Sequence, residues 1–226
     1  MKIGTATIGQ TPREDVLVEM REILGRGIEI LERGALDGLG REDLRRLGAV
    51  PGEEFLVTRL RDGSEVRVAE KHIPSSVARC IADLESRGVA AIILLCTAEF
   101  PDLTCARPLL WAGRILTYTA RAVLPRGRLG VLIPAAEQAP MARRKWAAVG
   151  YELVIEAASP YSSSPAELEN SARRLAEARV DLVALDCIGF ARRAQETVRD
   201  ITGKPVLCPR TLAARIAVEV IGSQAE

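Results

Sequence analysis

The sequence predicts an α/β protein with two pseudo-symmetric lobes, each a mainly parallel sheet flanked by helices. Short apolar runs alternate with helical patterns throughout the 226 residues, which is typical of βαβ units. The runs Val89–Leu95 and Val180–Leu185 are apolar on both faces, as central strands of parallel sheets are. The first is followed by Cys96 and the second, after Asp186, by Cys187, so the two halves repeat one pattern.

Turn and helix signals divide the first half into elements. Pro12 and the acidic residues that follow it mark a helix start, and Asp62-Gly63-Ser64 marks a hairpin turn. In order, we expect a strand at Lys2–Gly9, a helix carrying Val16, Leu17, Met20, Ile23 and Leu24 inward, a strand at Ile28–Leu31, a loop and short charged helix at Ala35–Leu47, a hairpin at Phe55–Ala69, a helix at Ile73–Leu84 and a strand at Val89–Leu95.

The second half repeats this order without the hairpin. We expect a strand at Arg128–Pro134, a helix at Ala135–Val149, a strand at Tyr151–Ala157, a helix at Pro165–Ala178 and a strand at Val180–Leu185. Pro108 and Pro205 each precede a short strand and a helix. The last helix, Thr211–Ile221, is expected to pack back on the first half. The predicted lobes are therefore 1–98 plus 210–226, and 99–209, with the active-site cleft between them.

Composition limits the classes of partner. A net charge of +1 argues against nucleic acid, and we interpret the basic runs Arg41–Arg46 and Arg143–Lys145 as solvated faces. No run reaches the roughly 20 apolar residues of a membrane span, and the N-terminus lacks a signal-peptide pattern. We expect a cytoplasmic protein with no nucleic-acid or membrane partner, and leave a homodimer open.

The cysteines are the strongest candidates for chemistry. The chain has five cysteines, one histidine and no CxxC pair, which disfavours a metal site, a disulfide redox centre or a Ser-His-Asp triad. Ligands of open parallel sheets bind beyond the carboxyl ends of the strands, where Cys96 and Cys187 lie. If the halves face each other, both thiols reach one cleft, and we expect a sulfur separation of roughly 6–9 Å, as direct proton transfers require.

Two thiols on opposite faces of a carbon suit proton removal and return at that carbon. Backbone N–H groups of Thr97, Ala98, Ile188 and Gly189 could stabilise the oxygens of the intermediate. The alternative interpretation is that each cysteine is a buried packing residue, as we expect for Cys80. Cys105 and Cys208 are expected to be packing or loop thiols.

Other polar residues allow two interpretations each. Arg13 fits either a clamp for a substrate carboxylate or a solvated residue in a first helical turn. Arg59 with Asp62 fits either a lid over the cleft or a dimer contact. Tyr161 is expected near the mouth of the cleft, whereas His72 reads as a helix cap or surface group.

Several segments together resemble the AroM family over nearly the whole chain. They are TIGQTPRED (Thr7–Asp15), ERGALDGL (Glu32–Leu39), LVTRLRDGS (Leu56–Ser64), LLCTAEF (Leu94–Phe100), Glu137-Gln138 with Lys145-Trp146, SPY (Ser159–Tyr161) and DCIGF (Asp186–Phe190). That family in turn resembles the aspartate/glutamate racemase superfamily, which includes hydantoin racemases, maleate isomerases and arylmalonate decarboxylases. The resemblance implies two pseudo-symmetric α/β lobes, one cysteine from each, and no metal or pyridoxal phosphate.

The resemblance also implies roles by position. Cys96 and Cys187 correspond to the two acid/base cysteines, and Thr97 to a threonine that binds substrate carboxylate. Thr7 and Gln10 correspond to polar substrate contacts after the first strand. Glu137 and Gln138 occupy the equivalent loop of the second half. This sequence departs from the pattern after the second cysteine, where Ile188-Gly189 replaces a hydroxyl-bearing threonine.

Three functions remain open from the sequence. The first is a cofactor-independent racemase or isomerase of a small carboxylate-bearing molecule, working by two-cysteine acid/base proton transfer. The second is a decarboxylase that needs one cysteine as proton donor. The third is a catalytically silent small-molecule-binding or regulatory protein with the same cleft.

Overall fold

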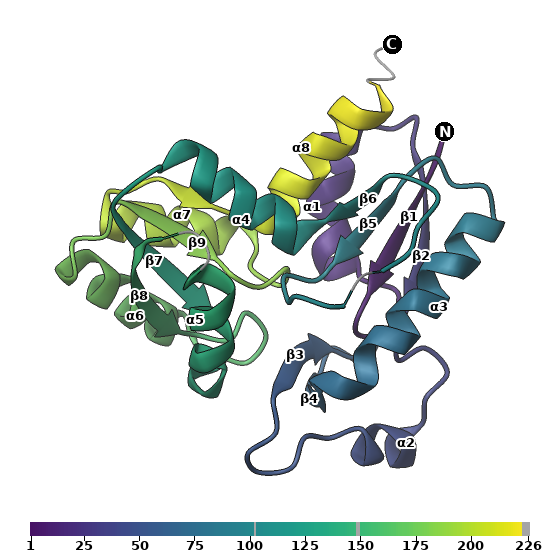
Figure 1. The fold of residues 1–226 in the computed structure, drawn as a ribbon, viewed down its shortest axis with the longest axis horizontal. Helices are drawn as coiled ribbons and strands as arrows, with labels where there is room; N and C mark the ends of the chain where they lie inside the picture. The colour runs from purple at the N-terminus through teal and green to yellow at the C-terminus, as the bar shows by residue number, and fades with distance from the viewer. Residues whose placement is uncertain (102, 148–149, 223–226) are drawn as a thin grey trace.

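The computed structural model describes residues 1–101, 103–147 and 150–222, and shows two α/β lobes connected side by side (Figure 1). The first lobe contains β1 (Lys2–Thr7), α1 (Glu14–Leu24), β2 (Glu29–Gly34), α2 (Arg41–Arg46), β3 (Phe55–Arg59), β4 (Glu65–Ala69), the 3₁₀ turn η1 (Glu70–His72), α3 (Ile73–Ser86), β5 (Ile92–Leu95) and β6 (Leu109–Trp111). The remaining elements are α4 (Ala112–Val123), β7 (Arg128–Ile133), η2 (Ala136–Gln138), α5 (Ala139–Ala147), β8 (Glu152–Ala157), α6 (Pro165–Glu177), β9 (Leu182–Leu185), α7 (Arg192–Thr202), β10 (Val206–Leu207) and α8 (Pro209–Ile221).

The two main sheets have the same topology. The first has the order β2-β1-β5-β6 and the second β8-β7-β9-β10, and every neighbouring pair is parallel. Each strand of the first sheet thus has a counterpart in the second, taken in chain order. The predicted fold of two pseudo-symmetric, mainly parallel lobes is confirmed.

One expected boundary is wrong. The first lobe was expected to end at residue 98, but β6 pairs in parallel with β5 through registers such as Ile92↔Leu109. The first sheet therefore extends to Trp111, because its fourth strand comes after the loop that follows Cys96. The helix expected over Ala135–Val149 is also divided, into η2 and α5, and Val149 lies outside the described residues.

Each lobe receives the last helix of the other half. Helix α4 follows the first sheet, yet its Leu116 and Ala120 pack with Val131 of the second lobe. Helix α8 follows the second sheet, yet its Ala213 and Ala217 pack in the cluster of α1 and β5, as expected for the C-terminal helix. Figure 1 shows α8 lying along α1. This exchange joins the lobes through two helices that each bury one face.

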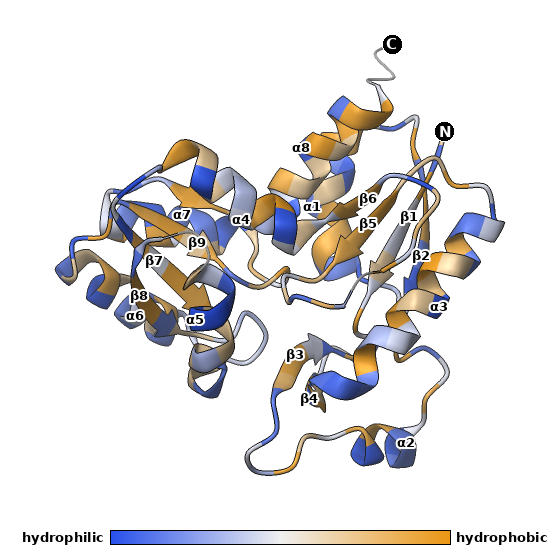
Figure 2. Cartoon of the chain, viewed as in Figure 1, coloured by the Kyte–Doolittle hydropathy of each residue, from blue (hydrophilic) through white to orange (hydrophobic). Residues whose placement is uncertain are grey.

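The expected hairpin at Phe55–Ala69 is present as β3 and β4, paired antiparallel from Phe55↔Ala69 to Arg59↔Glu65. It lies below the end of the first sheet in Figure 1, next to α3 and α2. Figure 2 shows that β5, β6 and β7 are mostly hydrophobic, whereas β1 is of intermediate hydropathy and α2 is mostly hydrophilic. None of the helices in the described part of the chain is long and apolar enough to cross a membrane.

One inner strand of each main sheet, β1 in the first and β7 in the second, carries a glycine against which a helix packs. A Cβ atom on Gly4 of β1 would lie 3.0 Å from Leu84 of α3. A Cβ atom on Gly130 of β7 would lie 3.1 Å from Leu175 of α6. The missing side chains let both leucines seat directly on the sheets, and each leucine is fully buried.

We predict that Leu175→Ala destabilises the protein strongly. The substitution removes a buried side chain and leaves a cavity above Gly130, which costs about 2–5 kcal/mol. Urea unfolding followed by circular dichroism measures the loss. The exposed Val18 provides the control, because Val18→Ala removes apolar atoms that remain largely in water. Equal effects from the two substitutions would contradict the packing described for the second lobe.

Candidate active site

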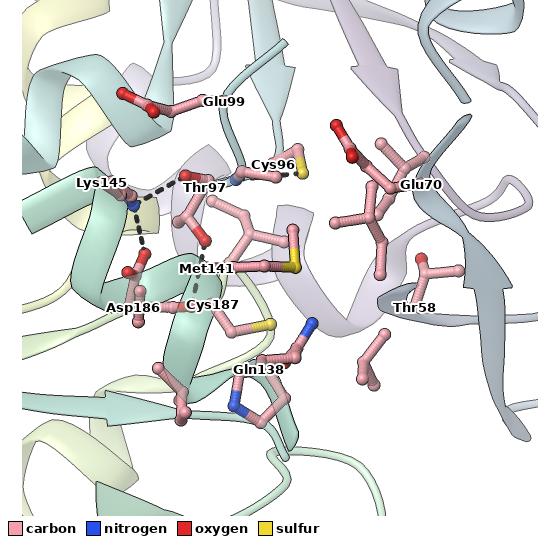
Figure 3. Close-up of a pocket in the computed structure, with 18 of the residues that line it drawn as sticks. Thr58, Glu70, Cys96, Thr97, Glu99, Gln138, Met141, Lys145, Asp186 and Cys187 are labelled. Atoms are coloured by element: carbon pink, nitrogen blue, oxygen red, sulfur yellow. Dashed lines mark hydrogen bonds and ion pairs between the residues drawn. The ribbon is translucent and has the colours of Figure 1, made fainter. Parts of the chain in front are cut away.

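A pocket of about 230 Å³ lies where the two lobes and the hairpin meet. The first lobe contributes the loop after β5, the second contributes the loops after β7 and β9 together with α5, and the hairpin segment supplies a third wall (Figure 3). Its lining residues include Cys96, Thr97, Cys187, Met141, Thr58 and Glu70. The carboxyl ends of the central strands of both sheets therefore face one pocket, as open parallel sheets favour.

Both candidate cysteines line this pocket. Cys96 directly follows β5, and Cys187 follows β9 after one intervening residue. They are 5% and 6% exposed, and Figure 3 shows both sulfur atoms facing the pocket from different lobes. The pseudo-symmetry of the sheets is thus the reason that two residues distant in sequence converge. The sulfur separation of 6–9 Å stays a prediction.

The amide two residues after each cysteine points at its sulfur. Ala98 N–H donates to Cys96 Sγ at 3.4 Å, and the Gly189 amide acts likewise on Cys187. Burial nevertheless raises the pKa of the Cys96 thiol to about 12, with the Ala98 amide opposing it. Burial also raises the pKa of Cys187, opposed by the Gly189 amide and Tyr161. Both groups are therefore neutral thiols at pH 7.

A buried ion pair stands behind the cysteine loops. Lys145 Nζ donates to Asp186 Oδ1 at 2.5 Å and to Thr97 O at 2.7 Å. Trp146 Nε1 donates to Asp186 Oδ2 at 2.7 Å. Thr97 Oγ1 donates to the backbone oxygen of Asp186 at 3.0 Å. This network ties the residue after Cys96 to the residue before Cys187, and so joins the two lobes at the pocket (Figure 3).

A second inter-lobe contact lies beside Cys187. Arg13 is 1% exposed; it donates from Nη2 to Tyr161 Oη at 3.1 Å and pairs with Asp15 at 2.9 Å. Tyr161 Oη in turn lies 4.0 Å from Cys187 Sγ. A Cβ atom on Gly189 would lie 2.5 Å from Tyr161 Oη, so this tyrosine fits only because residue 189 is glycine.

The sequence matches the profile of one protein family over nearly its whole length. The profile of the family described as AroM protein matches residues 3–221. The chain belongs to the AroM family. No curated protein matches its sequence.

Solved structures similar to this AroM-family chain share its fold. Glutamate racemase from Aquifex pyrophilus is 16% identical with a TM-score of 0.59, over 99% of this chain and 84% of that one. Maleate isomerase from Pseudomonas putida S16 is 13% identical with a TM-score of 0.63, over 98% and 92%. Arylmalonate decarboxylase is 14% identical with a TM-score of 0.62, over 100% and 94%. At these identities the likeness establishes the aspartate/glutamate racemase fold.

Four of the expected binding residues line the pocket beside the cysteines: Thr97, Ala98, Gln138 and Ile188. Two of them have interactions that change their expected roles. The Thr97 hydroxyl already donates to Asp186 O, so its backbone N–H is the group left for a ligand. Gln138 Nε2 donates to Phe55 O at 2.9 Å and thereby connects the second lobe to the hairpin.

The other five expected residues do not line the pocket in the described structure. Thr7 accepts from Arg13 at 2.9 Å, and Arg13 reaches the pocket only through Tyr161. Gln10 donates to Leu36 O and accepts from Arg61 N, which fixes loops at the end of the first sheet. The remaining two are Glu137, exposed and paired with Arg67, and Gly189, which makes room for Tyr161.

Sequence reasoning missed several lining residues and misread one. Lys145 was expected on a solvated face but is 8% exposed, because it lies on the inner face of α5 with Met141 and Ala142. A lysine at helical spacing from apolar residues was the available signal. Glu70 and Thr58 had no signal, since the hairpin segment reaches the pocket only through tertiary packing. Among the described residues, no group of three His, Cys, Asp or Glu side chains could hold a metal ion.

We predict that Asp186→Asn destabilises the fold. The substitution keeps the shape of the side chain but leaves the Lys145 ammonium buried without its counter-charge, which costs about 3–5 kcal/mol. Urea unfolding at pH 7 measures this. The matched control is Glu169→Gln in the exposed pair with Arg173, where little change is expected. If Asp186→Asn has the same free energy of unfolding as the unsubstituted protein, the buried ion pair does not contribute to stability as predicted.

We predict that alkylation of Cys96 keeps accelerating up to pH 10. The thiolate is the reacting species, and with a pKa of about 12 its fraction grows about tenfold per pH unit throughout this range. Iodoacetamide labelling resolved by peptide mass spectrometry gives the rate at each cysteine. The partly exposed Cys105 serves as the internal reference and is expected to react first. A Cys96 rate that levels off below pH 9 would contradict the effect of burial.

Proposed function

We propose that this protein is a cofactor-independent racemase or isomerase that moves a proton at the carbon next to the carboxylate of a small molecule. The observation that carries the proposal is the convergence of Cys96 and Cys187 on one pocket from equivalent strand ends of the two lobes. A base on one face of a carbon and an acid on the other is the arrangement that inversion requires.

The reaction uses the two sulfurs in sequence. Because both thiols are protonated at pH 7, the reaction begins when one of them loses its proton to the solvent. The resulting thiolate accepts the α proton: the S–H bond forms, the C–H bond breaks, and the electron pair moves into the adjacent carboxylate as an enediolate. The other cysteine then gives its thiol proton to the opposite face of the carbon and becomes the thiolate. Turnover in one direction therefore exchanges which sulfur carries the charge, and the reverse turnover restores it.

Backbone groups next to the cysteines suit the enediolate. The amides of Thr97 and Ile188 directly follow the cysteine of the first lobe and that of the second, and both residues line the pocket. Amide donors fixed by the fold stabilise developing negative charge without reorganising. The pocket of about 230 Å³ is smaller than the roughly 300 Å³ at which pockets for drug-sized ligands begin, which favours a compact substrate.

A one-cysteine decarboxylase is the second candidate, and the neutral state of the thiols favours it. A decarboxylation produces a carbanion by losing carbon dioxide, so it needs a proton donor and no base. Burial keeps both thiols protonated at pH 7, which is the state that a donor requires. A catalytically silent binding protein with this cleft is the third candidate.

We predict that the two single substitutions separate these functions. The protein is incubated in deuterated buffer with a panel of amino acids, hydroxy acids, hydantoins and substituted malonates, and products are analysed by mass spectrometry and chiral chromatography. If it racemises, deuterium enters the α position, and Cys96→Ala and Cys187→Ala each abolish inversion, by at least about 10³-fold, because neither thiol can replace the other.

A decarboxylase gives a different pattern, because one of the two variants retains turnover of the malonates. The control is Cys105→Ala, a thiol outside the pocket, which should retain full activity in either case. A binding protein would show neither exchange nor turnover, while ligand-induced shifts in melting temperature would persist in both pocket variants. That last pattern would refute the proposed enzyme.

A further inference from the structure

The two cysteines are equivalent in the fold but have different neighbours. Cys96 accepts from the Ala98 amide, and Lys145, the cation that lowers its pKa, is already bonded to Asp186 and to Thr97 O. Cys187 has the corresponding Gly189 amide and, in addition, the Tyr161 hydroxyl at 4.0 Å. No counterpart of that hydroxyl contacts Cys96 in the described part of the chain.

The second partner of Tyr161 leaves its hydroxyl proton available to Cys187, although either atom of that contact can be the donor while Cys187 is protonated. Arg13 Nη2 donates to Tyr161 Oη at 3.1 Å, and a guanidinium can only donate. The oxygen of Tyr161 is therefore occupied as an acceptor on the Arg13 side, and its own proton is free to point at Cys187 Sγ. Burial and the neighbouring Cys187 raise the pKa of Tyr161, so the hydroxyl keeps that proton.

Three features hold Tyr161 in this position. Gly189 leaves the space that a Cβ atom would fill. Arg13 is itself fixed, because Asp15 accepts from both its Nε and Nη2 and Thr7 Oγ1 accepts from its Nη1. The guanidinium also lies 5.8 Å from the centre of the tyrosine ring, within the range of a cation–π contact. A partly buried, preorganised hydroxyl therefore lies within contact of one sulfur only.

We infer that Tyr161, oriented by Arg13 of the opposite lobe, is a positioning residue that stabilises the Cys187 thiolate, so that Cys187 is the base and Cys96 the acid in the free enzyme. This assignment rests on the two-thiol function proposed above and specifies which cysteine removes the first proton. The first proton is taken by Cys187 and the second is given by Cys96. The O–H···S⁻ contact strengthens when charge is present on sulfur, as hydrogen bonds to charged groups do.

Other charged groups around Cys187 do not supply this asymmetry. The titratable and charged groups that act on the two sulfurs are Arg13, Tyr161, Asp186, Lys145 and the other cysteine of the pair. Glu54, Glu70, Glu99 and Arg144 also line the pocket that both cysteines share. Asp186 disfavours ionisation at both sulfurs, and its charge is compensated by Lys145. The Arg13–Tyr161 pair acts on Cys187 and has no counterpart among the groups that act on Cys96.

The test measures thiol reactivity in the full-length protein without any substrate. Iodoacetamide alkylation at Cys96 and Cys187 is followed by peptide mass spectrometry from pH 6 to pH 10. We expect Cys187 to react faster than Cys96 in the unsubstituted protein. Tyr161→Phe keeps the ring but removes the donor, so the Cys187 rate should fall about tenfold, the effect of one hydrogen bond to a charged group, with the pH profile moved upward. The rate of Cys96 alkylation at each pH should be the same as in the unsubstituted protein.

Two further variants make the result specific. Tyr151→Phe is the matched control, because its hydroxyl is buried without a partner and its side chain packs in the core of the second lobe, outside the pocket; neither cysteine should change. Gly189→Ala displaces the Tyr161 hydroxyl while keeping the backbone amide, and should reproduce the loss at Cys187. Circular dichroism and melting temperature verify that each variant is folded.

A wild-type Cys96 rate above that of Cys187, or an equal fall at both cysteines in Tyr161→Phe, would overturn the inference. Failure of the proposed function is a separate outcome, since it would appear as absent deuterium exchange while the difference in thiol reactivity persists. If Tyr161→Phe leaves the pH profile of Cys187 alkylation unchanged while the protein still exchanges deuterium into its substrate, the role of Tyr161 is refuted and the two-thiol reaction stands.

Discussion

The ion pair between Lys145 and Asp186 is the interaction on which the geometry of the pocket depends. Asp186 precedes Cys187 in the chain, and Lys145 also holds the carbonyl of Thr97, the residue after Cys96. A charge pair buried to this degree is costly unless its remaining hydrogen bonds are satisfied, and Trp146 supplies one of them. The same contacts that compensate the buried charges therefore set the cysteine loops against each other.

The hairpin makes the pocket of this chain different from one built by two lobes alone. It is inserted after the second strand of the first lobe, whereas in the described part of the second lobe α6 is the next element after β8. Its contacts with the second lobe are polar: Gln138 reaches Phe55 O, Arg67 pairs with Glu137, and Arg144 pairs with Glu54. The hairpin itself is anchored in the first lobe, because Leu56 and Val68 are buried in its hydrophobic core, where Met141 of the second lobe also packs.

Much of the candidate site could be predicted because strand ends are readable from sequence. An apolar run followed by a cysteine places that cysteine at the carboxyl edge of a sheet, and repeating the run places the second one equivalently. The roles of Arg13 and Lys145 could not be predicted in this way. Both side chains look solvated in sequence, yet each is buried by an element from elsewhere in the chain: the loop that carries Tyr161 covers Arg13, and the loop that carries Asp186 covers Lys145.

The sequence by itself determined the two parallel sheets, the hairpin, the crossing of the last helix and the candidate thiols, because periodicity and turn residues act over a few neighbouring positions. Only the tertiary structure decided that β6 joins the first sheet, that Glu70 and Thr58 face the thiols, and that Tyr161 contacts Cys187 and not Cys96. The pairing of β6 arises within the first lobe, whereas the other features depend on how one lobe is oriented on the other. That orientation arises from buried contacts between residues far apart in the chain, such as Arg13 with Tyr161 and Thr97 with Asp186, which leave no local pattern in the sequence.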